Sequence, residues 1–226
     1  LLFSSAHAEV VEVPQEELAL ESVLPKFDRP DSVRSRNIVT EKKIELGVYL
    51  GWNTLEPIRS QNKYGFNLGY HWSETSAFVL NYAKWVSGLN NQYTDDLSAS
   101  PNNLDFNRSP SINYSVFGHY EWKVFYGKIS VTKQGVVNLS TYPIFGLGIT
   151  GYDHKNYYGF DGGVGQKFYF SKNSALRADF KLQYSQSPSP FLKGRMQKSQ
   201  PLPTGSDFKD KWGLGTIIDI GYSFLF

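Results

Sequence analysis

The sequence predicts an all-β protein, an eight-stranded antiparallel transmembrane β-barrel with a short N-terminal periplasmic helix and linker. Three observations predict this fold. From residue 43 onward, hydrophobicity alternates with a period of two over eight segments of 10 to 15 residues, about the length that crosses a hydrocarbon layer as a tilted strand. One parity of these segments is apolar, and the other carries charges and glycines. Aromatic residues gather at both segment ends, as they do at the two interfaces of a bilayer.

Composition narrows the class of protein. The chain has 226 residues, of which 16% are aromatic and 20 are glycine, and this favours strands and tight turns. The formal net charge of +2 is small and dispersed, so we expect no nucleic-acid partner. The chain has no cysteine, which excludes disulfides, thiolate metal ligands and cysteine nucleophiles.

The first 41 residues differ from the rest of the chain. Residues 1–8, LLFSSAHA, have the apolar stub and small-x-small ending of a secretory signal, with cleavage expected after Ala8. Residues 9–41 are acidic and then turn-rich, which predicts a periplasmic segment with a helix at 14–27. The barrel is expected to occupy residues 42–226. No apolar run of 18 residues is present, so no transmembrane helix is expected.

The eight expected strands follow in order, and their number is even, as is usual for bacterial barrels. They are 44–53, 62–73, 76–87, 111–122, 137–150, 157–170, 174–185 and 212–226. Short turns at 73–76 and 171–174 alternate with long loops at 87–110 and 185–211, which indicates a periplasmic and an external side. Segment 123–135 is too long for a turn and is either a periplasmic flap or an extension of the flanking strands.

The two faces of the strands are expected to meet different surroundings. The apolar parity, such as Leu46, Val48, Ile112 and Ile218, would face lipid, and the other parity, such as Asn113, would face inward. In the third strand we place Phe78, Leu80 and Tyr82 outward. The other parity holds charges that nearly balance and would be costly in the bore if unpaired. We therefore expect an interior polar network of Glu45, His71, His119, Glu121, Lys167, Arg177, Asp179, Lys181 and Asp219.

Aromatic residues form two expected belts if both termini lie in the periplasm. The outer belt comprises Trp52, Tyr64, Tyr158, Tyr184 and Trp212, and the inner belt comprises Trp72, Trp122, Phe168, Phe170, Tyr222 and Phe226. Such belts place the chain in the outer membrane of a Gram-negative cell. The terminal Phe226 also lies where the barrel-insertion machinery would read its assembly signal. We therefore expect this machinery to be a partner.

Catalytic and metal sites are poorly supported by the sequence. His119 and Glu121 share one strand face, but no third ligand accompanies them, so no metal is expected. Asp153 and His154 fall in an outer loop with Asp161 near the same rim, where barrel acyltransferases and proteases work, yet no matching nucleophile is present. We therefore expect no catalytic residue and no cofactor.

Small and polar residues interrupt the lipid-facing parity. Gly162 and Gln166 lie on the sixth expected strand, and Gly118 lies on the fourth. Because polar groups at that depth prefer a protein partner, these positions predict side-by-side packing of copies into a ring that holds lipid. Lysines in loop 186–211 could meet lipopolysaccharide phosphates, although solvated surface charge is the simpler interpretation.

Four stretches resemble a known family. They are SRNIVTEKKIELGVYLGW, YHWSETSAFVL, YGKISV and GLGITGYD, in this order. Together they resemble the outer-membrane β-barrel domain of myxobacteria, Bdellovibrio and related Gram-negative bacteria, over roughly residues 35–226. In layout the chain is similar to an OmpA transmembrane domain that lacks the peptidoglycan-binding tail. The resemblance implies location and fold, and it brings no reaction.

The sequence leaves three functions open. An eight-stranded barrel has a bore wide enough only for side chains or one small ligand. The leading expectation is therefore a structural barrel with a filled bore that contributes to envelope integrity or lipid organisation. A narrow channel for ions or small solutes is the alternative, and a lipid-modifying barrel enzyme is a distant third.

Overall fold

The computed structural model describes residues 38–54, 58–99, 103–130, 136–189 and 196–226. All of them belong to one compact unit, Ser35–Phe226. The expected signal remnant, its cleavage site and the helix at 14–27 lie outside the described residues. In the part described, no helix is long and apolar enough to cross a membrane.

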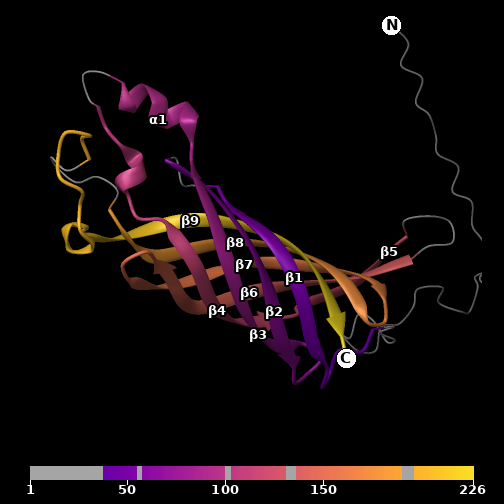
Figure 1. The fold of residues 1–226 in the computed structure, drawn as a ribbon. Coiled ribbons are helices and arrows are strands. Elements are labelled where there is room, and N and C mark those ends of the chain that lie inside the picture. The colour runs from indigo at the N-terminus through magenta and orange to yellow at the C-terminus, as the bar shows by residue number, and fades with distance from the viewer. Residues whose placement is uncertain (1–37, 55–57, 100–102, 131–135, 190–195) are drawn as a thin grey trace, which may run out of the picture. The chain divides into compact units, whose positions relative to one another are not determined.

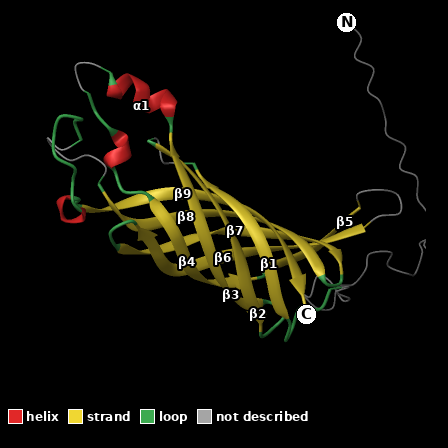
Figure 2. Ribbon diagram, in the orientation of Figure 1, coloured by secondary structure: helices red, strands yellow, loops and turns green. Residues whose placement is uncertain are grey.

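Eight strands form a closed antiparallel barrel, which confirms the predicted fold (Figures 1 and 2). The strands are β1 (Ile44–Asn53), β2 (Arg59–His71), β3 (Ser76–Leu89), β4 (Ile112–Trp122), β5 (Phe125–Ser130), β6 (Val136–Tyr152), β7 (Asn156–Ser171), β8 (Ser174–Pro188) and β9 (Asp210–Leu225). Their order is β4-β3-β2-β1-β9-β8-β7-β6-β5, and the pairing of β4 with β6 closes the ring. The ninth strand, β5, is an addition to the eight.

Strand β5 extends the wall of the barrel at one end (Figure 1). β4 pairs with β6 from Tyr152 to Ile144, and β5 pairs with β6 from Thr141 to Val136. Pro143 lies where β6 changes its partner from β4 to β5. Because no regular pairing exists at this point on that edge of β6, the missing N–H of proline removes no ladder hydrogen bond there. Of the two interpretations of segment 123–135, the strand extension is therefore the observed one, for its described part.

The last strand closes against the first. β9 pairs with β1 from Leu225 opposite Glu45 to Ile217 opposite Asn53. The backbone N–H of Phe226 donates to the carbonyl of Ile44 at 2.9 Å, so the final residue is held in the sheet. Both β1 and β9 thus have one end beside the short turns at 73–75 and 172–173, which we call the turn end, and the opposite end is the loop end.

The strands alternate between an apolar exterior and a polar interior. Leu46, Val48 and Ile218 are exposed on the outside, whereas the residues between them on β1 and β9 face the bore. In β3 the outward residues are Phe78, Leu80 and Tyr82, as predicted. Apolar surface outside and charge inside is the arrangement of a transmembrane barrel.

Two expected facings at the start of β4 are wrong. Ile112 was expected to face lipid with the rest of its parity, yet it is buried in the bore against Trp85 and Ile217. A β-bulge between Ile112 and Tyr114 inserts one extra residue relative to β6 and reverses the alternation at the start of β4. The neighbouring Asn113, expected inside, instead donates from Nδ2 to Asp153 at 2.8 Å at the exposed rim.

The loop end carries the remaining described elements. These are the helix α1 (Asn91–Ser98) and the short 3-10 turns η2 (Phe106–Arg108) and η3 (Gly205–Asp207). The helix lies in a segment predicted only as loop. Ile58, Phe106 and Met196 form a small apolar cluster there, and Arg108 donates from Nη1 to the carbonyl of Gln200 at 2.8 Å. The long connections are thus packed against one another.

Candidate functional site: the polar network of the bore

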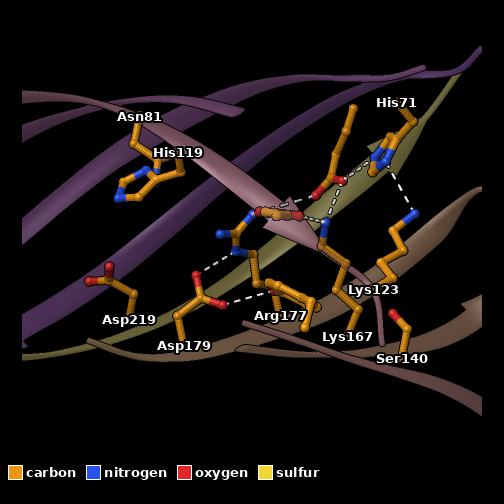
Figure 3. A network of polar contacts seen from close by, with 12 residues as sticks. His71, Asn81, His119, Lys123, Ser140, Lys167, Arg177, Asp179 and Asp219 are labelled. Atoms are coloured by element: carbon orange, nitrogen blue, oxygen red, sulfur yellow. Dashed lines mark hydrogen bonds and ion pairs between the residues drawn. The ribbon is translucent and has the colours of Figure 1, made fainter. Parts of the chain in front are cut away.

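A lysine shared by two carboxylates lies at the centre of the turn-side half of the bore (Figure 3). Nζ of Lys167, on β7, donates to Oε2 of Glu45 at 2.7 Å and to Oε2 of Glu121 at 2.8 Å. All three side chains are at most 1% exposed. The two carboxylates come from β1 and β4, which lie three and two strands away from β7 around the ring, so this single cation ties three non-adjacent strands together.

A second cation completes this group. Nη1 of Arg177 lies 2.5 Å from Oε1 of Glu121, and its Nε donates to Oδ2 of Asp179 at 2.6 Å. The hydroxyl of Tyr142 donates to the other oxygen of Asp179 at 2.8 Å, and its ring lies 4.9 Å below the ammonium of Lys167. We call Glu45, Glu121, Lys167, Arg177 and Asp179 the turn-side cluster. Buried charges are tolerable only when paired and hydrogen-bonded in this way.

The turn-side cluster continues to the mouth of the bore through a histidine (Figure 3). Nε2 of His71 lies 2.8 Å from Oε2 of Glu45, and its Nδ1 lies 3.1 Å from Nζ of Lys123. An ammonium can only donate, so when Lys123 is charged Nδ1 accepts and the proton of the neutral ring is on Nε2, aimed at Glu45. Lys123 also donates to Oγ1 of Thr40 at 2.6 Å. Its burial lowers the pKa of Lys123 to about 7.

A separate group occupies the loop-side half of the bore. Nζ of Lys63 lies 2.9 Å from Oδ1 of Asp219 and donates to its Oδ2 at 3.1 Å, and Nζ of Lys181 lies 2.8 Å from the same Oδ2. Next to it, Nε2 of His119 lies 2.9 Å from Oδ2 of Asp161, and Nδ1 of the same ring lies 3.1 Å from the amide of Asn81. We call Lys63, His119, Asp161, Lys181 and Asp219 the loop-side cluster.

The structure places all nine predicted network residues inside the barrel: five form the turn-side cluster, three belong to the loop-side cluster, and His71 lies between Glu45 and Lys123. Three further members are Lys63, Lys123 and Asp161, which the sequence reasoning did not assign to the network. Lys63 lies four positions from Asn67, and Asp161 lies six positions from Lys167, so both have the inward parity of their strands. Alternation was therefore a sufficient signal for them. Lys123 follows the end of β4, where alternation stops, so no pattern marks it.

The remaining space in the bore is small. A cavity of about 10 Å³ lies within the loop-side cluster, and another of about 10 Å³ lies at the turn end beside Thr40 and Lys123. Each has room for about one water molecule. Among the described residues, no three His, Asp or Glu side chains are grouped to hold a metal ion. The geometry is that of a packed polar core.

The structure does not assemble the residues that suggested chemistry. His119 contacts Asp161, whereas Glu121 contacts Lys167 and Arg177, so the two residues belong to different clusters. Asp161 lies inside the bore and not at the outer rim. His154 instead approaches the hydroxyl of Tyr157 at 3.0 Å.

Asp153 has a local structural role at the rim. Its carboxylate accepts from the backbone N–H of Ser111 at 3.1 Å and from the amide of Asn113 at 2.8 Å. Partial burial raises the pKa of Asp153, but the hydrogen bonds from Ser111 and Asn113 together outweigh this effect. The pKa of Asp153 therefore lies below its usual value. The carboxylate fastens the start of β4 to the β6–β7 connection.

The outward positions that suggested belts and copies are also in place. The eleven belt aromatics are exposed on the outer wall, except for the half-buried Phe168. Gly118 has a role within the chain, because a Cβ there would lie 2.9 Å from the ring of Phe78. Gly162 has no such neighbour within 3.8 Å, and Gln166 lies directly opposite Thr141 of β6 on the same outer face.

Comparison with known proteins gives only distant likenesses. No family model matches the chain, and no curated protein matches it either. Among solved structures, the N-terminal β-barrel domain of Pseudomonas aeruginosa OprF is 13% identical and covers 82% of this chain and 98% of its own, with a TM-score of 0.39. Neisserial surface protein A is 12% identical, with 81% and 96% covered and a TM-score of 0.44. A de novo designed transmembrane β-barrel is 14% identical, with 82% and 97% covered and a TM-score of 0.38. Likeness at this level says nothing about what the chain binds or does.

Proposed function

We propose that this chain is an outer-membrane β-barrel with a closed bore that serves the envelope as a structural element and has no reaction of its own. The observation that supports this proposal is the filled interior, in which Lys167, Arg177, Lys63 and Lys181 are each paired with buried carboxylates. A path for ions would need a continuous aqueous lumen, and cavities of about 10 Å³ do not provide one.

The exterior supports a lipid environment for this barrel. The outward residues of β9, β1 and β2 form an apolar groove of about 530 Å³ over Val48 and Leu50, with Phe66 and Tyr222 on its sides. Exposure of such an apolar surface to water is unfavourable, whereas acyl chains can fill the groove without that cost. Membrane lipid is therefore the proposed neighbour of this wall, and the barrel-insertion machinery is the proposed route by which the chain reaches it.

Conductance through planar bilayers tests the closed bore. We expect the purified full chain to insert without discrete current steps over a wide voltage range. A matched variant, Lys167→Ala with Arg177→Ala, removes two cations from the centre of the turn-side cluster and should either leak or fail to fold. Regular, voltage-stable steps from the unaltered chain would show that the alternative function, a narrow channel, is correct.

Self-association in the membrane is a second proposed property. Thr141 and Gln166 face each other across β6 and β7 on the outer wall, where lipid offers neither a donor nor an acceptor. A second copy could satisfy both groups, which is the basis of the predicted ring of barrels enclosing lipid. Gly162, four residues along β7, would allow close approach of that copy.

The test of self-association is the mass of the assembly in lipid. We expect native mass spectrometry from nanodiscs to show more than one copy for the unaltered chain, and one copy for Gln166→Leu. The control is Val164→Leu on the same strand face, which keeps the surface apolar. A single copy for the unaltered chain would remove this proposal and leave the closed-bore function intact.

A further inference from the structure

A cavity at the loop end of the bore has a character unlike that of the charged clusters. Its volume is about 80 Å³, room for roughly five to eight water molecules. Its polar lining consists of three amides and three hydroxyl groups, namely Asn53, Gln61, Gln183, Thr150, Ser185 and Ser187. Several of these residues are half-exposed, so solvent reaches the cavity. We call it the vestibule.

Charge is absent from the described lining of the vestibule. Each of its lining residues is uncharged, although Gln183 and Ile217 also line the small cavity of the loop-side cluster. Anions would find no cation there, and cations would find no carboxylate. A ligand that fits this lining is therefore neutral and has several hydroxyl or amide groups.

An apolar layer forms the floor of the vestibule. Trp85, Ile112 and Ile217 pack together, with the half-buried Tyr152 against them, and all four line the cavity. The indole N–H of Trp85 is already used, because it donates to Oγ of Ser115 at 2.9 Å. The floor thus offers aromatic and aliphatic surface and no competing polar atom from the indole.

One polar atom in the vestibule lacks a partner. Thr150 is 3% exposed, and within the described part of the chain no hydrogen-bond partner is found for its Oγ1. A buried hydroxyl without a partner costs stability, and such exceptions need an explanation. Its neighbours are partly committed already, since Asn53 donates to Gln61 at 2.8 Å and Gln183 donates to Ser185 at 3.3 Å. The Thr150 hydroxyl is the group that a ligand would satisfy.

Glycines on β9 keep the vestibule open. A Cβ at Gly213 would meet only Oγ of Ser187, at 4.0 Å, and a Cβ at Gly215 would meet only atoms of Asn53, at 3.5 Å or more. Both positions have the inward parity of β9, opposite Ser185 and Gln183 of β8. A larger residue would fit there without displacing backbone, so close packing does not demand glycine at either position.

We propose that the vestibule binds one neutral pyranose sugar ring. A pyranose has apolar C–H faces for the floor of Trp85 and Ile217, and it has hydroxyls at its edge for the amides and for Thr150. The size of the cavity admits one ring with part of it left in solvent. Two sources share this chemistry, a free monosaccharide and the terminal residue of a surface polysaccharide.

The first experiment titrates sugars onto the full chain in a zwitterionic detergent without a sugar headgroup, because maltoside or glucoside headgroups would compete. The probes are the methyl glycosides of glucose, galactose and N-acetylglucosamine, with glucuronic acid and glucosamine as charged controls. We expect millimolar binding of at least one neutral probe by isothermal titration calorimetry, and weaker binding of both charged controls. No binding of any neutral probe at tens of millimolar would overturn the proposal, as would preference for a charged one.

Two variants locate the binding. Gly213→Leu fills the vestibule and should abolish binding, whereas the control Gly88→Leu adds the same side chain to an exposed, outward position of β3 with no atom within 4 Å. Thr150→Val removes the unpartnered hydroxyl, and we expect binding about five- to tenfold weaker with no loss of thermal stability. Unchanged binding in Gly213→Leu would place the sugar elsewhere and refute the site.

The last arm distinguishes the two sources. An oligosaccharide that ends in the preferred ring is compared with its methyl glycoside, in the full chain and in Thr150→Val. Tighter binding of the oligosaccharide identifies a terminal residue of a polysaccharide as the ligand, because the loops then add contacts. Weaker binding of the oligosaccharide identifies the free sugar. With either result, Thr150→Val should weaken the binding of the oligosaccharide and of the methyl glycoside by the same factor.

Discussion

The two charged clusters of the bore are built on opposite plans. In the turn-side cluster a cation, Lys167, lies between the carboxylates of Glu45 and Glu121. In the loop-side cluster a carboxylate, Asp219, lies between two ammonium groups. Arg177 is a second cation in the turn-side cluster, where it contacts the carboxylates of Glu121 and Asp179. The comparison teaches that a cluster of buried charges can be built around one shared residue of either sign, so we expect each cluster to have one most sensitive position.

Loss of the shared cation should have the largest effect. Lys167→Met leaves Glu45 and Glu121 buried with Arg177 as their main remaining cation, and buried groups that lose a charged partner are strongly destabilised. We expect the free energy of unfolding to fall by about 3–5 kcal/mol. Urea unfolding of the full chain in lipid vesicles, followed by tryptophan fluorescence, measures this change.

The rescue for that variant keeps the test informative if folding fails. Adding Glu45→Gln to Lys167→Met removes the charge that the substitution isolates, and we expect part of the stability to return. Lys172→Met, in the exposed turn before β8, is the matched control and should change the free energy of unfolding by less than about 0.5 kcal/mol. A cost for Lys167→Met no greater than this control would contradict the plan of the turn-side cluster.

Loss of the shared carboxylate should have a smaller effect. In Asp219→Asn one amide oxygen can still accept from a lysine, and the ammonium of Lys63 lies 5.3 Å from the ring of Tyr49 and 5.4 Å from that of Trp85. We expect a decrease of about 1–2 kcal/mol in the free energy of unfolding. The same unfolding experiment measures it. Asp210→Asn, a change in an exposed ion pair with Lys155, serves as control.

The sequence predicted the fold and the nine network residues because alternation carries that information. A period of two assigns every residue of a regular strand to one face, and Glu45, Lys167 and Asp219 needed nothing more. Alternation fails where the strand is irregular, and so Ile112 was placed outside, because a bulge leaves no mark in composition. The grouping into two clusters depends on the register between strands distant in the sequence, which no local pattern contains.

The vestibule lay beyond sequence reasoning for a related reason. Alternation gives its glycines, Gly213 and Gly215, the inward parity, so the sequence indicates space there that neighbouring side chains can fill. Whether a neighbour fills that space depends on strand tilt and stagger around the closed barrel. Thr150 shows the same limit, since a threonine in a strand gives no sign in sequence that its hydroxyl will lack a partner.

A dependence of stability on pH is expected at the turn end, where the turn-side cluster reaches Lys123, whose ammonium contacts Thr40 and His71. The pKa of Lys123 is about 7 in the folded protein, against 10.5 for an exposed lysine. Between these two pH values the unfolded chain holds a proton that the folded chain lacks, so the free energy of unfolding rises with pH, by about 1.4 kcal/mol per pH unit at most. Below pH 7 both states are protonated and this contribution to the slope vanishes.

Urea unfolding between about pH 6 and about pH 9 measures this slope, and Lys123→Met should remove it. Lys172→Met, in the exposed turn before β8, is the control and should keep the slope of the unaltered chain. Equal slopes in Lys123→Met and the unaltered chain would show that the lysine at the mouth of the bore stays charged.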